Sequence, residues 1–132
     1  MAKKADELII DSLSNNWQVN HAPSAGTTCT ASVQPTMAGS HERLHLTQLG
    51  WSIRNVSAAA YTATLSVRDA TIGGAVLGTW DIVIASNTGL QDSWAVNMIG
   101  LKGNALNIDF GTPAASVTQK VSAAGWRNQS AD

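Results

Sequence analysis

The stretch Tyr61-Thr-Ala-Thr-Leu-Ser-Val-Arg68 decides the fold of this chain, because apolar and polar residues alternate along it. Its odd-numbered positions carry Tyr, Ala, Leu and Val, and its even-numbered positions carry Thr, Thr, Ser and Arg. Successive side chains of a β-strand point to opposite faces, so such a run buries one face and leaves the other in water. A turn-like Ile72-Gly-Gly74 follows. The stretch therefore predicts a half-buried strand.

Further runs of the same kind extend in both directions and are separated by turn signals. They cover Trp17–His21, Thr27–Gln34, Glu42–Val56, Val76–Ala85, Ser93–Ile99, Leu106–Phe110 and Ser116–Trp126. About eight strands at near-regular spacing, without a long helical pattern, predict an all-β fold: an antiparallel β-sandwich with a jelly-roll-like arrangement. Bent strands and unequal connections favour the jelly roll over an up-and-down barrel.

The run Glu42–Val56 changes its apolar parity midway. Apolar residues stand at even positions first, Leu44 and Leu46, and at odd positions from Leu49 onward. A parity switch inside a strand is typical of a β-bulge, which we expect near Thr47-Gln48. Long bent strands of this kind can cross from one sheet of a sandwich to the other, and we expect that here.

Composition limits the possible partners. The chain has 132 residues, enough for one domain, with only 13% charged residues and a net charge of −1. Binding to nucleic acid or to an anionic membrane surface needs concentrated Lys and Arg, so neither partner is expected. The start of the chain lacks the apolar stretch of a signal peptide, and no run is long enough to span a membrane. We therefore expect synthesis in the cytoplasm, and a surface suited to packing against other proteins.

Residues 1–16 differ from the rest and are predicted to form an N-terminal arm, leaving residues 17–132 as the single β-sandwich domain. The arm carries an apolar group beside acidic residues and is too short to be stable without docking on something. Either it folds over its own domain or it packs on a neighbouring subunit. The candidate interface residues in the arm are Leu8, Ile9, Ile10 and Leu13.

The tryptophans divide into two groups. Trp51, Trp80 and Trp94 share a strand face with aliphatic neighbours, which predicts core packing. Trp17 and Trp126 stand near the two ends of the domain, so they are the better candidates for contacts outside it.

No group of residues predicts a metal or cofactor site. His41 and His45 lie four positions apart, which in a strand separates them by about 13 Å, too far to share an ion. Cys29 is alone and is expected to be a small core residue. Metal ligands and cofactors are therefore not expected.

Catalytic motifs are also missing from the sequence. The spacing selects no catalytic pair from the strand and turn carboxylates, which are Asp69, Asp81, Asp92 and Asp109. There is no Gly-x-Ser-x-Gly, phosphate-binding glycine loop or Cys-x-x-Cys. We therefore expect that the protein is not an enzyme.

Several segments together resemble a family of small virion proteins of tailed phages, the head decoration or cement type. The likeness spans most of the chain from Asn16 onward. The segments are Asn16-Trp-Gln-Val-Asn-His-Ala-Pro23, Ser66-Val-Arg-Asp-Ala70 with Gly73-Gly74, Val76-Leu-Gly-Thr-Trp80, Gly100-Leu-Lys-Gly-Asn-Ala-Leu106 and Val121-Ser-Ala-Ala-Gly-Trp126.

This resemblance implies a structural virion protein with no catalytic residues. Such a protein would bind the outer surface of an icosahedral head, bridge neighbouring major capsid proteins and associate with itself as a dimer or trimer. Its location would be the capsid surface, after assembly in the host cytoplasm. Two other functions stay open: a carbohydrate-binding β-sandwich module of a phage tail or fibre and, with less support, a small hydrolase.

Overall fold

The computed structural model describes residues 16–36, 41–69 and 74–129, and these ranges contain eight strands and no helix. Among these residues, no helix could therefore span a membrane. The strands in chain order are β1 (Asn16–His21), β2 (Cys29–Val33), β3 (Glu42–Asn55), β4 (Tyr61–Arg68), β5 (Val76–Ile84), β6 (Thr88–Ile99), β7 (Leu106–Gly111) and β8 (Val117–Gln129).

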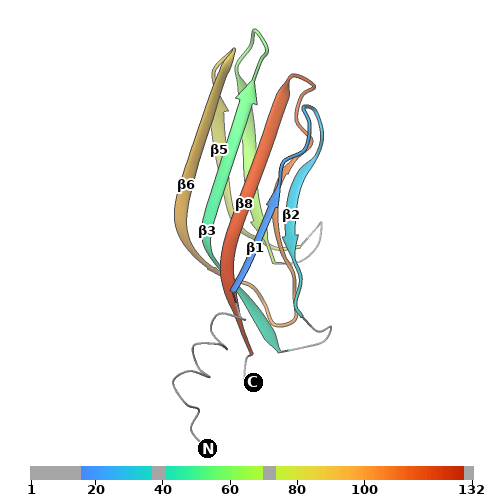
Figure 1. Ribbon diagram of the computed structural model, residues 1–132, viewed down its shortest axis with the longest axis vertical. Helices are drawn as coiled ribbons and strands as arrows, with labels where there is room; N and C mark the ends of the chain where they lie inside the picture. The colour runs from blue at the N-terminus through green and yellow to red at the C-terminus, as the bar shows by residue number, and fades with distance from the viewer. Residues whose placement is uncertain (1–15, 37–40, 70–73, 130–132) are drawn as a thin grey trace, which may run out of the picture.

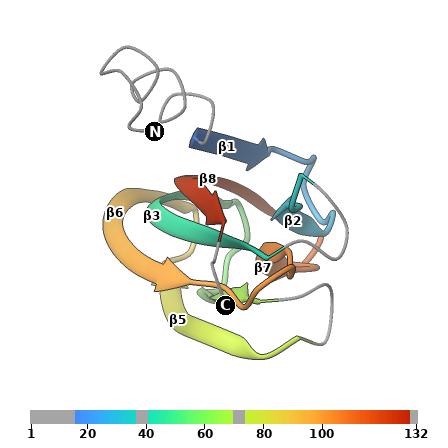
Figure 2. The ribbon, with the colours of Figure 1, turned by 90° about the horizontal axis from the view of Figure 1, so that it is seen from below.

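The strands form two antiparallel sheets of four that pack face to face (Figures 1 and 2). The front sheet has the order β1-β8-β3-β6, and the back sheet has the order β2-β7-β4-β5. Only β4 and β5 are consecutive in the chain and also neighbours in a sheet. The other connections pass between the sheets, as in a jelly roll. The predicted all-β, eight-stranded, jelly-roll-like sandwich is confirmed.

The core lies between the sheets and follows the predicted alternation. In β4, Ala63, Leu65 and Val67 are buried while Thr62 and Thr64 face water. The fully buried side chains of both sheets include Leu44, Leu46, Leu49, Ile53, Leu65, Ile84, Leu106 and Ile108. Each such side chain contributes roughly 1.5–3 kcal/mol through its removal from water.

Three tryptophans extend this core toward the side of the sandwich where β5 and β6 lie. The Trp51 and Trp94 ring centroids are 5.6 Å apart, and those of Trp80 and Trp94 are 5.4 Å apart. Trp51 is buried, and the other two are partly buried against the core. The prediction that these three residues pack in the core is confirmed.

Strand β3 contains the predicted bulge but does not change sheets. Its register shifts between Leu46 and Gln48 against both neighbours, β6 and β8. The extra residue lies in β3 where it pairs with β8, and in β6 where β6 pairs with β3, so both ladders change register at the same point. Beyond this point β3 continues in the front sheet to Asn55. The expectation that this strand crosses to the other sheet was therefore wrong.

The predicted arm, including Leu8, Ile9, Ile10 and Leu13, lies outside the described residues, apart from Asn16, which begins β1. The described chain starts at an edge of the front sheet, where Asn16 is the register partner of Trp126. The beginning of β1 and the end of β8 thus lie side by side at one end of the sandwich (Figure 1).

Candidate binding surface

The outward face of the front sheet is built from cross-strand rows that the register defines. One row runs Asn20, Ser122, Gly50 and Ser93 across β1, β8, β3 and β6. A second row runs Gln18, Ala124, Gln48 and Ala95, and a third runs Asn16, Trp126, His45 and Ile99. Small and uncharged side chains therefore dominate the middle of this face.

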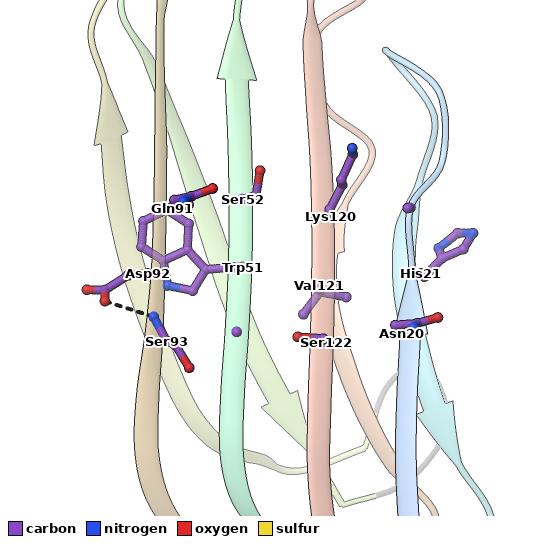
Figure 3. Close-up of a pocket in the computed structure, with 12 residues that line it drawn as sticks. Asn20, His21, Trp51, Ser52, Gln91, Asp92, Ser93, Lys120, Val121 and Ser122 are labelled. Carbon is purple, nitrogen blue, oxygen red and sulfur yellow. Dashed lines mark hydrogen bonds between the residues drawn. The ribbon is translucent and has the colours of Figure 1, made fainter.

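Three connected depressions follow the strands along this face, and together we call them the trough. The upper one, of about 600 Å³, is lined by residues of all four strands, among them Asn20, Ser52, Gln91, Lys120 and Ser122 (Figure 3). The middle depression, of about 190 Å³, shares Ser122 with it. The lower depression, of about 520 Å³, shares Gln18 with the middle one. The trough is therefore continuous from one end of β1 to the other.

Small residues keep the floor of the trough low. A Cβ atom on Gly50 would lie 2.7 Å from Oγ of Ser122, so any side chain here would displace its neighbour. Ala124 and Ser122 continue the floor along β8. A side chain as large as Leu at these positions would fill the depression.

The lower end of the trough has an aromatic wall. The rings of His45 and Trp126 stack with centroids 3.7 Å apart and planes at 9°. Nε2 of His45 lies 2.7 Å from Oδ1 of Asn128, a hydrogen bond that fixes the imidazole. The lower depression borders Trp126 and Asn16 but not His45, so it lies on the indole side that His45 leaves uncovered.

Four side-chain amides along the trough make no hydrogen bond to another described residue. They are Gln18, Asn20, Gln48 and Gln91. Each carries two donor hydrogens and an acceptor oxygen. The only charged lining residues are Asp92 and Lys120, both in the upper depression. The trough thus offers neutral hydrogen-bonding groups.

The outward face of the back sheet is different, because its polar side chains bond to one another. Thr30 donates to Asp109 at 2.7 Å, and Thr64 donates to Asp81 at 2.7 Å. Ser32 donates to the side chain of Asn107 at 2.7 Å. These cross-strand pairs use up hydrogen-bonding groups that a ligand would need. The front sheet is therefore the better candidate for binding.

Three of the predicted turn and strand carboxylates, Asp81, Asp92 and Asp109, have local hydrogen-bond partners. Asp109 accepts hydrogen bonds from Thr30 and from the backbone N–H of Gly111, and Asp92 accepts from the indole N–H of Trp94. Within the described ranges, no three His, Cys, Asp or Glu residues come together as a metal site. Cys29 is fully buried, and this burial, with the nearby charge of Asp109, raises the pKa of its thiol from 9.0 to about 11. The prediction of Cys29 as a core residue is confirmed.

The two terminal tryptophans have different positions. Trp17 is buried in the core, and its indole N–H donates to the backbone carbonyl of Trp126 at 3.0 Å. Because β1 turns this residue inward, Trp17 has almost no surface to offer a partner, and the expectation of an outside contact was wrong for it. Trp126, on the outward face, is 40% exposed. It is the one predicted interface residue in the described ranges that is available to a partner.

Sequence reasoning missed the four amides. The signal was present, since Gln18 and Asn20 are the polar positions of an alternating run. What the run could not indicate is that Gln48 and Gln91, from distant segments, come to the same face.

No protein-family model matches the chain, and no curated protein matches it. Solved structures with a similar fold include viral capsid proteins and carbohydrate-binding modules. The coat protein of Tobacco streak virus shares 12% identity over 85% of this chain and 86% of that chain, with a TM-score of 0.38. A chain of Broad Bean Stain Virus shares 8% identity over 87% of both chains, with a TM-score of 0.49. A family 6 carbohydrate-binding module shares 12% identity over 89% of this chain and 91% of that chain, with a TM-score of 0.39. Likeness at this level does not bear on function.

Proposed function

We propose that this chain is a structural virion protein of the head decoration, or cement, type. It binds the outer surface of a phage head and bridges neighbouring major capsid proteins, as a homodimer or homotrimer. It acts through surface contacts and not through turnover. The sequence resemblance supports this role, and so does a surface with few charges.

The observation that carries the proposal is the row Trp126–His45–Ile99 at one end of the front sheet, which we call the apolar row. Ile99 is 47% exposed and Trp126 is 40% exposed, and both are register partners of His45. Leu101, two residues beyond Ile99, is also exposed. Large apolar side chains gathered at one end of a domain favour a protein contact there.

A cement protein needs only a modest contact in each copy. A standard interface covers on the order of 800 Å² per partner. Many copies bridging adjacent capsid subunits reinforce one another, because linked sites bind with high effective concentration. A rigid sandwich with its interface at one end suits that task.

Binding to undecorated heads tests the proposal. We expect Ile99→Asp to reduce co-sedimentation with heads at least tenfold, because it places a charge in the apolar contact. Val83→Asp is the matched control, since Val83 is even more exposed but lies on the outward face of the back sheet. Equal binding by both variants and the unaltered protein would refute the apolar row as the contact.

The arm is tested separately. Deletion of residues 1–14 is expected to leave the sandwich folded, because the described strands begin only at Asn16. If Leu8, Ile9, Ile10 and Leu13 pack on a neighbouring subunit, this truncation weakens head binding. Unchanged binding to undecorated heads would remove the arm from the interface.

A further inference from the structure

We propose that the trough on the front sheet binds a short, uncharged oligosaccharide, with Trp126 as the stacking platform at its lower end. This is a second binding activity, which shares Trp126 with the apolar row but does not use Ile99. Three properties of the trough support it: its aromatic wall, its free amides and its lack of charge along most of its length.

The aromatic wall is built to present one face. His45 covers one side of the Trp126 indole at 3.7 Å, and its hydrogen bond to Asn128 holds the imidazole there. The other side borders a depression of about 520 Å³ that Gln18 and Thr47 also line. A sugar ring has an apolar C–H face that packs on an aromatic ring, while hydroxyl groups project from its rim toward polar neighbours. The indole and the surrounding polar groups match both parts of such a ring.

The free amides match the hydroxyl groups. A sugar hydroxyl both donates and accepts, and so does a primary amide. Gln18 borders the lower and middle depressions, Gln48 the middle one, and Asn20 and Gln91 the upper one. The distance along β1 from Asn16 to His21 is about 17 Å, so the trough accommodates several linked units and not a single sugar.

An extended peptide fits the trough less well. Peptides that bind sheets usually pair with a free strand edge, through backbone groups. The floor here is formed by β8 and β3, both central strands whose backbone groups already pair on two sides. The lining offers side-chain amides and no deep apolar pocket for peptide side chains. The middle and lower depressions are lined only by uncharged residues, which favours a neutral ligand over an acidic one.

Binding is tested on an array of neutral gluco-, manno-, galacto- and xylo-oligosaccharides of three to six units. Sialylated glycans and a set of neutral peptides are included for comparison. We expect the full-length protein to bind at least one neutral oligosaccharide series, with affinity then measured by titration calorimetry. Failure to bind any neutral oligosaccharide, or stronger binding to the sialylated glycans or the peptides, would overturn the proposal.

Variants locate the site. Trp126→Ala is expected to weaken oligosaccharide binding at least tenfold. The double variant Gln18→Ala with Asn20→Ala is expected to weaken it similarly. Because both amides are exposed, the double variant should keep the thermal melting temperature of the unaltered protein. Thr62→Ala, exposed on the opposite sheet, is the control and should bind normally. Oligosaccharide binding unaffected by the double variant would refute the trough as the site.

The two activities are separable by one variant. Ile99→Asp lies outside the lining of the trough and should keep oligosaccharide binding even where head binding is lost. Loss of both in a folded Ile99→Asp variant would contradict the claim that the two binding activities are separable.

Discussion

His45 and Trp126 stack face to face across β3 and β8, with ring centroids 3.7 Å apart and planes at 9°. They are direct register partners, although they lie 81 positions apart in the sequence. The pair belongs to the apolar row, and Trp126 also lines the lower end of the trough. The position of the indole therefore affects both the proposed head contact and the proposed oligosaccharide site.

The stacking energy of this pair is measurable. Double-mutant cycles of stacked rings give about 0.5–1.5 kcal/mol beyond the area they bury. We expect His45→Ala and Trp126→Ala to show a coupling in this range in urea unfolding. Strict additivity of the two single variants would mean that the rings do not stabilise each other in solution.

Asn55 is expected to be the most important polar residue for stability. Its fully buried side chain donates to the carbonyl of Ala59 at 2.9 Å and accepts from the backbone N–H of Ser57 at 3.1 Å. The same amide also donates to the carbonyl of the fully buried Ile84 at 3.4 Å. Asn55→Ala removes all of these bonds and leaves that buried carbonyl without the amide donor, so it should lower the free energy of unfolding by about 2–4 kcal/mol. Asn97→Ala, on the exposed side of β6, should change it by less than about 0.5 kcal/mol. Similar melting temperatures for the two variants would contradict this role.

Gly125 permits the close approach of β8 to β3. A Cβ atom there would lie 1.8 Å from the carbonyl oxygen of His45 and 2.7 Å from the ring of Trp17. Since backbone cannot yield as a flexible side chain does, Gly125→Ala should cost at least about 3 kcal/mol or prevent folding. Gly89→Ala meets no atom closer than 3.5 Å and should change stability by at most about 1 kcal/mol. A Gly125→Ala variant as stable as Gly89→Ala would show that the two strands can move apart.

The buried thiol of Cys29 should make the free energy of unfolding fall at alkaline pH. Burial raises the pKa of its thiol from 9.0 to about 11, so the folded protein keeps a proton that the unfolded chain releases. The stability from the neutral thiol is complete below pH 9 and is lost as the pH rises toward about 11. The loss is on the order of 2 kcal/mol.

The measurement compares the unaltered protein with Cys29→Ala, so that other alkaline titrations cancel. The difference in free energy of unfolding between them should shrink from pH 8.5 to pH 11. A constant difference would mean that the folded thiol ionises as readily as the unfolded one. Maleimide should also label Cys29 only on unfolding, because the side chain is fully buried.

The sequence predicted local features well where one segment contains the whole signal. The alternation Tyr61–Arg68 became β4 with the expected buried side, and the parity change after Leu46 became the bulge of β3. Predictions of strand bounds failed where pairing with a neighbouring strand sets where the strand begins. The run that begins at Ser93 belongs to a strand that starts at Thr88, because pairing with β3 extends β6 through residues 88–92.

The burial of the two terminal tryptophans also depends on strand pairing, which the sequence does not show. Both stand near a chain end in the sequence, and both seemed equally available there. The register places Trp17 inward on β1 and Trp126 outward on β8, since the two are one step apart in their alternation. A one-residue difference in register therefore separates a core residue from an exposed one.

By itself, the sequence determined the strand content and most of the inward residues, Trp17 excepted, because side-chain alternation is a property of each strand alone. It also determined that charge is scarce. Only the tertiary structure decided which strands are neighbours, and with them the trough: Gln18, Gln48 and Gln91 come from three separate segments. They meet because antiparallel pairing brings together segments far apart in the chain, and no local pattern encodes that pairing.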